Sequence, residues 1–189
     1  MRILAVLIIS FTLQGCVAQM DAMAGLGVIS EEVSSFDGKR VVQVTPTFVA
    51  SDGKAYATSS KVGAIWSEAK PSEVLLVLEY SSSSSSSDVY RTYESFSVNI
   101  NGEISTFEVH GGTDLDSGSY NTVSKTIYTK STAVVTISLD YLHRMVEAED
   151  VRVRFTTNDG YEDGVFHENV SNYGQEMARA RIAKFLDLI

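Results

Sequence analysis

Alternating apolar and polar residues dominate the chain from Asp37 onward and predict a β-rich domain. The clearest alternation comes just before an Asn-Gly pair, where Phe96, Val98 and Ile100 share one face of the predicted strand. Asn-Gly favours the positive φ angles of a type I′ turn, so we expect a β-hairpin over residues 96–109. Further strands are predicted for the segments 39–50, 55–66, 122–129, 132–138 and 151–155.

Two stretches depart from simple alternation. Residues 74–78 form a continuous apolar run, whose length suits a central strand that is covered on both faces. Seven serines follow at 81–87, and such a tract cannot bury enough apolar surface to form its own structure. We expect a solvated loop or a hydrogen-bonding strand end there.

Pro46 lacks a backbone donor, so the strand that contains it is expected to bend or to lie at an edge.

Helical spacing occurs twice in the last third of the chain. Ser138 is a favourable N-cap, and the apolar residues after it recur at the helical period: Leu139, Leu142, Met145 and Val146. A second helix is predicted from about Tyr173 to Leu188, because Asn172 and Gln175 resemble a capping box. Its apolar stripe consists of Ala178, Ile182, Phe185 and Ile189.

Short strands with turn signals, followed by two helices, predict a β-rich α+β fold. The strands suit an antiparallel β-sandwich or a barrel-like domain, with a short helix and a C-terminal helix covering one end or one face. The chain length favours one globular domain, which we place at residues 37–189. Such a domain buries enough surface to need no disulfide.

The first sixteen residues have a different character. Arg2 precedes a short apolar run, and Leu13-Gln14-Gly15-Cys16 follows with the single cysteine of the chain. A basic start, an apolar stretch and a small residue at the cut are typical of a secretory signal, and the run is too short to span a bilayer. The arrangement resembles the lipobox of bacterial lipoproteins. That resemblance implies cleavage before Cys16, lipid such as diacylglyceryl and palmitate chains on this cysteine, and a protein tethered to a membrane.

The resemblance also implies a location. Val17, and not an aspartate, follows the cysteine; in enteric-type cells this favours the outer membrane, with the protein facing the periplasm. We therefore expect residues 1–15 to be a signal peptide and residues 16–36 to be the lipidated cysteine with a tether. Gly25 and Gly27 disfavour a stable helix in this tether.

Charge limits the partners. The formal net charge is −9, which disfavours nucleic acid and an anionic bilayer surface, because both repel an acidic protein. We expect the lipid on Cys16 to provide the membrane contact and an envelope protein to be the partner. The sequence suggests no cofactor.

The residues suited to chemistry form no convincing catalytic set. His110, His143 and His167 are the three histidines, and no Gly-x-Ser-x-Gly elbow is present. Asp114 and Asp116 precede a glycine at alternate positions and could offer oxygens to calcium. A full calcium-binding loop would need a glutamate where the chain has Lys125, so an acidic surface turn is the simpler interpretation.

Three aromatic and basic residues could also serve binding. Trp66, with the tyrosines, could form a face for sugars or peptides, although large aromatic residues in sheets usually belong to the core. Arg152 and Arg154 alternate on one predicted strand. They could meet an anionic partner or pair with nearby acids, Glu147, Glu149 and Asp150.

These features favour a non-enzymatic envelope lipoprotein that acts as a binding or assembly accessory. One alternative is a periplasmic ligand-binding or inhibitor module that uses loops such as 111–120 and 158–164. A second alternative is a hydrolase with an unfamiliar site.

Overall fold

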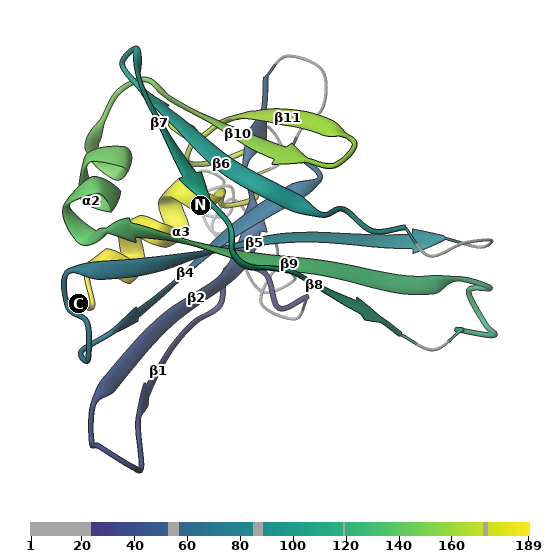
Figure 1. Cartoon of the computed structure of the whole chain (residues 1–189), viewed down its shortest axis with the longest axis horizontal. Coiled ribbons are helices and arrows are strands. Elements are labelled where there is room, and N and C mark those ends of the chain that lie inside the picture. Colours follow the sequence, from purple (N-terminus) through teal and green to yellow (C-terminus); the bar gives the residue numbers. More distant parts are fainter. Residues whose placement is uncertain (1–23, 53–56, 85–88, 119, 172–173) are drawn as a thin grey trace, which may run out of the picture.

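The described residues form a two-layer β-sandwich with two helices (Figure 1). The computed structural model describes residues 24–52, 57–84, 89–118, 120–171 and 174–189. One layer is a six-stranded antiparallel sheet in the order β1 (Ile29–Val33), β2 (Arg40–Phe48), β4 (Ser60–Ser67), β5 (Glu73–Ser84), β9 (Ile127–Ser138) and β8 (His110–Ser117). The other is a five-stranded sheet in the order β3 (Ala50–Ser51), β11 (Gly160–Val165), β10 (Val151–Thr157), β6 (Tyr93–Ile100) and β7 (Glu103–Glu108). The predicted β-rich α+β class is confirmed, and of the two architectures the sheets form the sandwich.

The core lies between the sheets and continues under the helices. Alternate residues of each strand point inward, as on β5, where Val74, Leu76 and Leu78 are fully buried. Within the five-stranded sheet, Phe96 of β6 lies opposite Phe155 of β10, and their buried rings are 5.3 Å apart between centroids. The helices α2 (Leu139–Glu147) and α3 (Ala178–Leu186) lie at one end (Figure 1). There α2 packs against β5 and β9, and α3 against β2 and β4.

Two predictions that rest on neighbouring residues, the turn after β6 and the N-cap of α2, are confirmed. Asn101 and Gly102 have φ angles of 51° and 96°, as a type I′ turn between β6 and β7 requires. The backbone N–H of Tyr141 donates to the Ser138 side chain, which is the predicted N-cap of α2.

The strand that contains Pro46 is bent. The pairing of β2 with β4 shifts register between Val44 and Thr47, so the proline lies in a bulge, where its missing donor does no harm. The bulge brings the backbone of β2 close to Gly63 on β4. A Cβ atom at Gly63 would lie 2.5 Å from the Val44 carbonyl oxygen, which explains a glycine within this buried strand.

The expected burial of residues 74–78 on both faces is wrong. Leu75 is 39% exposed, while its neighbours Val74 and Leu76 are fully buried. The five-stranded sheet and the helices pack on the face to which the even-numbered residues of β5 point. The outer face of β5 therefore has no covering layer among the described residues.

Two predicted boundaries in the N-terminal and central parts are corrected. Residues 29–33, expected in the tether, form β1 and pair with β2, with Glu31 opposite Val42. This strand is at a sheet edge and carries a serine and two glutamates, so it shows no apolar alternation. The predicted strands 122–129 and 132–138 are instead one strand, β9, which begins at Ile127.

The C-terminal helix is shorter than predicted. It begins at Ala178, after Met177, which makes no side-chain capping hydrogen bond. The residues before it are extended, because Glu176 forms an isolated bridge with Val170. The predicted apolar stripe is confirmed at Ala178, Ile182 and Phe185, all buried. Asn172, the predicted cap, lies outside the described residues, as do Cys16 and the rest of the predicted signal peptide. Among the described helices, none has the length and apolar character needed to cross a bilayer.

Candidate functional site

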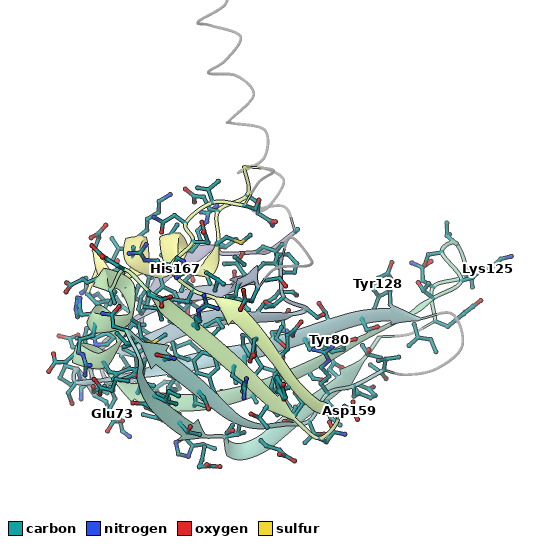
Figure 2. The ribbon with its side chains drawn as sticks, turned by 90° about the horizontal axis from the view of Figure 1, so that it is seen from above. Glu73, Tyr80, Lys125, Tyr128, Asp159 and His167 are labelled. Carbon is teal, nitrogen blue, oxygen red and sulfur yellow. The ribbon has the colours of Figure 1, made fainter. Side chains whose placement is uncertain are left out.

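A β-arm extends from one end of the sandwich. It consists of the ends of β5, β8 and β9 (residues 81–84, 114–117 and 127–131) and residues 120–126 at its tip. β5 and β9 pair along twelve residues each, from Glu73 opposite Ser138 to Ser84 opposite Ile127. Figure 1 shows these strands continuing beyond the five-stranded sheet, and Figure 2 shows Lys125 and Tyr128 at the far end, with Tyr80 nearer the body.

Hydroxyl groups hold the inner side of the arm. Thr129 and Ser131 of β9 are buried, although both are polar. The Thr129 hydroxyl donates to the Val89 carbonyl at 2.6 Å, and the backbone N–H of Arg91 donates to the Ser131 hydroxyl at 3.0 Å. The segment that leads into β6 is thus bound along the inner side of β9, and it satisfies polar groups that would otherwise be costly to bury.

An ion-pair cluster stiffens the base of the arm on its outer side. The Lys61 ammonium lies 2.7 Å from Glu79 and donates to Ser81 at 2.7 Å. Lys130, on the neighbouring strand, approaches the other oxygen of Glu79 at 3.4 Å. The Lys61 side chain is only 8% exposed, so the carboxylate is needed to compensate its lost hydration.

A second cluster joins the base of the arm to the five-stranded sheet. Glu162 of β11 accepts hydrogen bonds from the backbone N–H groups of Ser59 and Ser60, at 2.6 and 2.9 Å. It also pairs with Arg91 at 3.0 Å, and the Arg91 guanidinium lies 4.4 Å from the centre of the Tyr80 ring. Burial raises the pKa of the Glu162 carboxyl, but its hydrogen bonds to Ser59 and Ser60 and the charge of Arg91 outweigh burial and lower it. This carboxylate therefore stays charged and fixes the base of the arm.

The tip of the arm has its own hydrogen bonds. The Asn121 side chain accepts from the backbone N–H groups of Val123 and Ser124, and the Asn121 N–H donates to the Thr126 carbonyl. Lys125 has a φ of 56°, a left-handed conformation that costs about 1–2 kcal/mol for a side chain of this kind. The turn thus presents a defined shape.

That shape exposes apolar and aromatic side chains. Val123 is 92% exposed, and Tyr120 and Tyr128 are each 52% exposed. Lys125 stands among them and has no acidic partner within the described residues. Tyrosine is enriched at protein interfaces because it combines a large apolar surface with a hydroxyl group. The tip therefore carries an apolar and positively charged surface on a chain whose net charge is −9.

The predicted calcium ligands lie on the arm, but no further potential ligand joins them to complete a metal site among the described residues. Asp114 and Asp116 are exposed on one face of β8, opposite Thr132 and Lys130. The region predicted to be an acidic turn is a strand, which was hidden in the sequence because two glycines with positive φ interrupt its pairing between His110 and Asp114. Nowhere in the described parts of the chain do three or more potential metal ligands of the His, Cys, Asp or Glu type come together.

The other residues singled out in the sequence lie on separate elements. His110 is on β8, His143 is on α2, and His167 follows β11, where its ring accepts from the Val151 N–H. Trp66 belongs to the core and donates to the Pro71 carbonyl, so it offers no binding face.

The two arginines of β10 are paired mainly with acids that the sequence did not suggest. Arg152 contacts Asp52 at 2.6 Å and Asp150 at 3.6 Å. Arg154 binds Asp163 through two hydrogen bonds. Of the three acids proposed from the sequence, the structure pairs only Asp150 with these arginines.

Comparison of the chain with protein-family models, with curated proteins and with solved structures finds no match.

Proposed function

We propose that the chain is an envelope lipoprotein, anchored by lipid on Cys16, that binds a protein partner through the tip of its β-arm and has no enzymatic activity. The observation that carries the proposal is the arm itself. It exposes Tyr120, Val123 and Tyr128 at or beside a hydrogen-bonded turn, and Figure 2 shows Tyr128 and Lys125 away from the body of the sandwich. An ordered tip loses little conformational entropy on binding.

The chemistry of the tip defines the partner that it fits. An apolar pocket would accept Val123, and acidic groups at the rim of that pocket would pair with Lys125. An anionic bilayer surface would attract the tip but repel the acidic remainder of the domain, so we favour a protein.

The resemblance of residues 13–16 to a lipobox supports the location. Two or more acyl chains hold a protein stably at a membrane, whereas a single chain holds it only marginally. A tethered protein meets partners in the same membrane at a raised effective concentration. Outer-membrane anchoring follows from Val17 after the cysteine and is part of the same proposal.

Site-specific photo-crosslinking in intact cells tests this function. A photoreactive amino acid replaces Val123 in the full chain, and a second variant carries it at Val33, a residue on β1 that is 66% exposed. We expect a discrete crosslinked protein from position 123 and none from position 33. Equal crosslinking at both positions, or none at either, would contradict docking through the tip.

The anchor is tested separately with Cys16→Ser. We expect this variant to leave the membrane fraction or to remain unprocessed, with a corresponding change in mass. An unchanged fraction and unchanged mass would contradict lipidation while leaving the crosslinking result at Val123 interpretable.

A further inference from the structure

A second surface, on the opposite layer of the sandwich, has the features of a small-ligand site. The outer face of the five-stranded sheet contains a groove of about 260 Å³. Its polar lining comes from β6, β10, β11 and the residue after β3: Ser97, Asn99, Arg152, Arg154, Asp163 and Asp52. Ile104 of β7 forms an apolar wall and is 68% exposed.

The two arginines in this groove are held in place by carboxylates. Arg154 forms two hydrogen bonds with Asp163, at 2.7 and 2.8 Å, and lies 4.0 Å from the centre of the Tyr161 ring. Its hydrogen bond with Asp163 raises the pKa of the guanidinium. Arg152 donates to Asp52 at 2.6 Å. These ion pairs fix the two guanidiniums in position. Both groups are about half exposed, so they remain accessible to a ligand.

Donors and acceptors remain available. Among the described residues, Nη2 of Arg152 and Nη1 of Arg154 have no hydrogen-bond partner, nor does the side-chain nitrogen of Asn99. The Asn99 oxygen is occupied, because it accepts from the Gly102 N–H at 2.7 Å. Asp52 and Asp163 each retain lone pairs, since a carboxylate can accept about four hydrogen bonds.

The formal charges of the lining residues cancel, because Arg152 and Arg154 are balanced by Asp52 and Asp163. Asp150, outside the lining, adds one negative charge beside Arg152. A phosphate or carboxylate would therefore find no net positive field and would compete with carboxylates that already hold both guanidiniums. A cation would be repelled by the positive charges of the two arginines.

We propose that this groove binds a neutral saccharide. A sugar hydroxyl both donates and accepts, which matches fixed guanidinium and amide donors that alternate with carboxylate acceptors. The apolar C–H face of a sugar ring fits the exposed surface of Ile104. The groove is slightly below the usual size range of small-molecule pockets, about 300–1,000 Å³, and so suits one ring or the end of a glycan.

Nuclear magnetic resonance of the full chain in detergent tests the site directly. The probes are glucose, galactose, mannose and N-acetylglucosamine, added singly, with inorganic phosphate as the competing anion. We expect at least one sugar to cause saturable shifts of the Arg152 and Arg154 Nε–H signals and of the Asn99 side-chain amide. Absence of shifts with every sugar, or saturable shifts with phosphate alone, would overturn the proposal.

Two substitutions separate a saccharide site from an anion site. Asp52→Asn removes a charged acceptor, so sugar affinity should fall about tenfold, whereas an anion would bind more tightly. Arg152→Ala should weaken sugar binding by a similar factor. Its matched control is Arg144→Ala, because Arg144 also pairs with one exposed carboxylate, Glu103, outside the groove lining. Equal loss in the control, or tighter sugar binding by Asp52→Asn, would contradict the assignment. None of these results depends on the arm.

Discussion

The body of the sandwich and the β-arm share the long strands β5 and β9, but different forces stabilise the two regions. In the body, the inner positions of β5 and β9 are aliphatic, as at Leu76 and Val135, which lie opposite each other and are fully buried. In the arm, the same side of β9 carries Thr129 and Ser131, with hydroxyls bonded to the segment 89–91. The register does not change along the twelve paired residues. One sheet thus passes from a region stabilised by apolar burial to a region stabilised by hydrogen bonds.

Because of this difference, truncating a buried side chain should lower the free energy of unfolding more in the body than in the arm. Leu76→Ala removes a fully buried side chain and should lower the free energy of unfolding by about 2–5 kcal/mol, from lost burial and the cavity left behind. Denaturant unfolding of the purified protein measures the change. The matched control is Leu75→Ala on the same strand, where the side chain is 39% exposed and the cost should be well below that of Leu76→Ala. Equal losses would mean that the outer face of β5 is as tightly packed as the inner face.

The arm should respond locally to the loss of one hydroxyl. Ser131→Ala leaves the Arg91 N–H without its acceptor, which costs about 1–3 kcal/mol for a buried group. We expect faster hydrogen exchange at Arg91 and in the arm, with little change in the amides of the body. Ser83→Ala, at an exposed serine of β5 within the arm, is the control and should leave exchange unchanged. Faster exchange throughout the body would show that the arm and the core unfold as one unit.

The link between the two regions should depend on pH through Glu162. Its pKa is lower in the folded protein than in the unfolded chain, since hydrogen bonds and Arg91 outweigh burial. The stability that it contributes is therefore complete above the ordinary glutamate pKa of about 4.3 and is lost as the pH falls through the lower, folded value. Glu162→Gln should be less stable than the wild type at neutral pH, and the two unfolding curves should converge in acid. A difference that stays constant across this pH range would exclude the carboxylate charge as its source.

Most of the body could be predicted from the sequence because its signals are local. Alternation predicted the buried face of β6, the Asn-Gly pair predicted the turn at 101–102, and Ser138 predicted the start of α2. The failures also have local causes. Two glycines with positive φ interrupt β8, so the sequence there did not read as a strand. The edge strand β1 carries a serine and two glutamates that can face solvent, so it shows no apolar alternation.

The candidate sites could not be predicted in the same way. For the serine tract the sequence left a loop and a strand end open, and residues 81–84 form the strand end because β9 pairs with them. The groove depends on Asp52 and Arg152, which are 100 residues apart and meet only in the folded protein. Tyr120, Val123 and Tyr128 could have been noticed as apolar and aromatic residues in a polar segment, but their shared exposure follows from the arm.

The smallest effect on stability should come from the tip, where the effect on partner binding should be greatest. Val123 is 92% exposed, so Val123→Asp should change the free energy of unfolding by no more than about 0.5 kcal/mol. The new charge would have to be buried in an apolar pocket of the partner, so co-purification of the crosslinked protein should be lost. Val33→Asp, on the edge strand β1, should change neither quantity. If Val123→Asp lowered stability as much as Ser131→Ala does, the tip would be a structural element of the arm. If stability stays unchanged and binding is lost, Val123 contributes to partner binding and not to folding. Buried side chains then stabilise the body of this protein, while exposed side chains at the tip bind the partner.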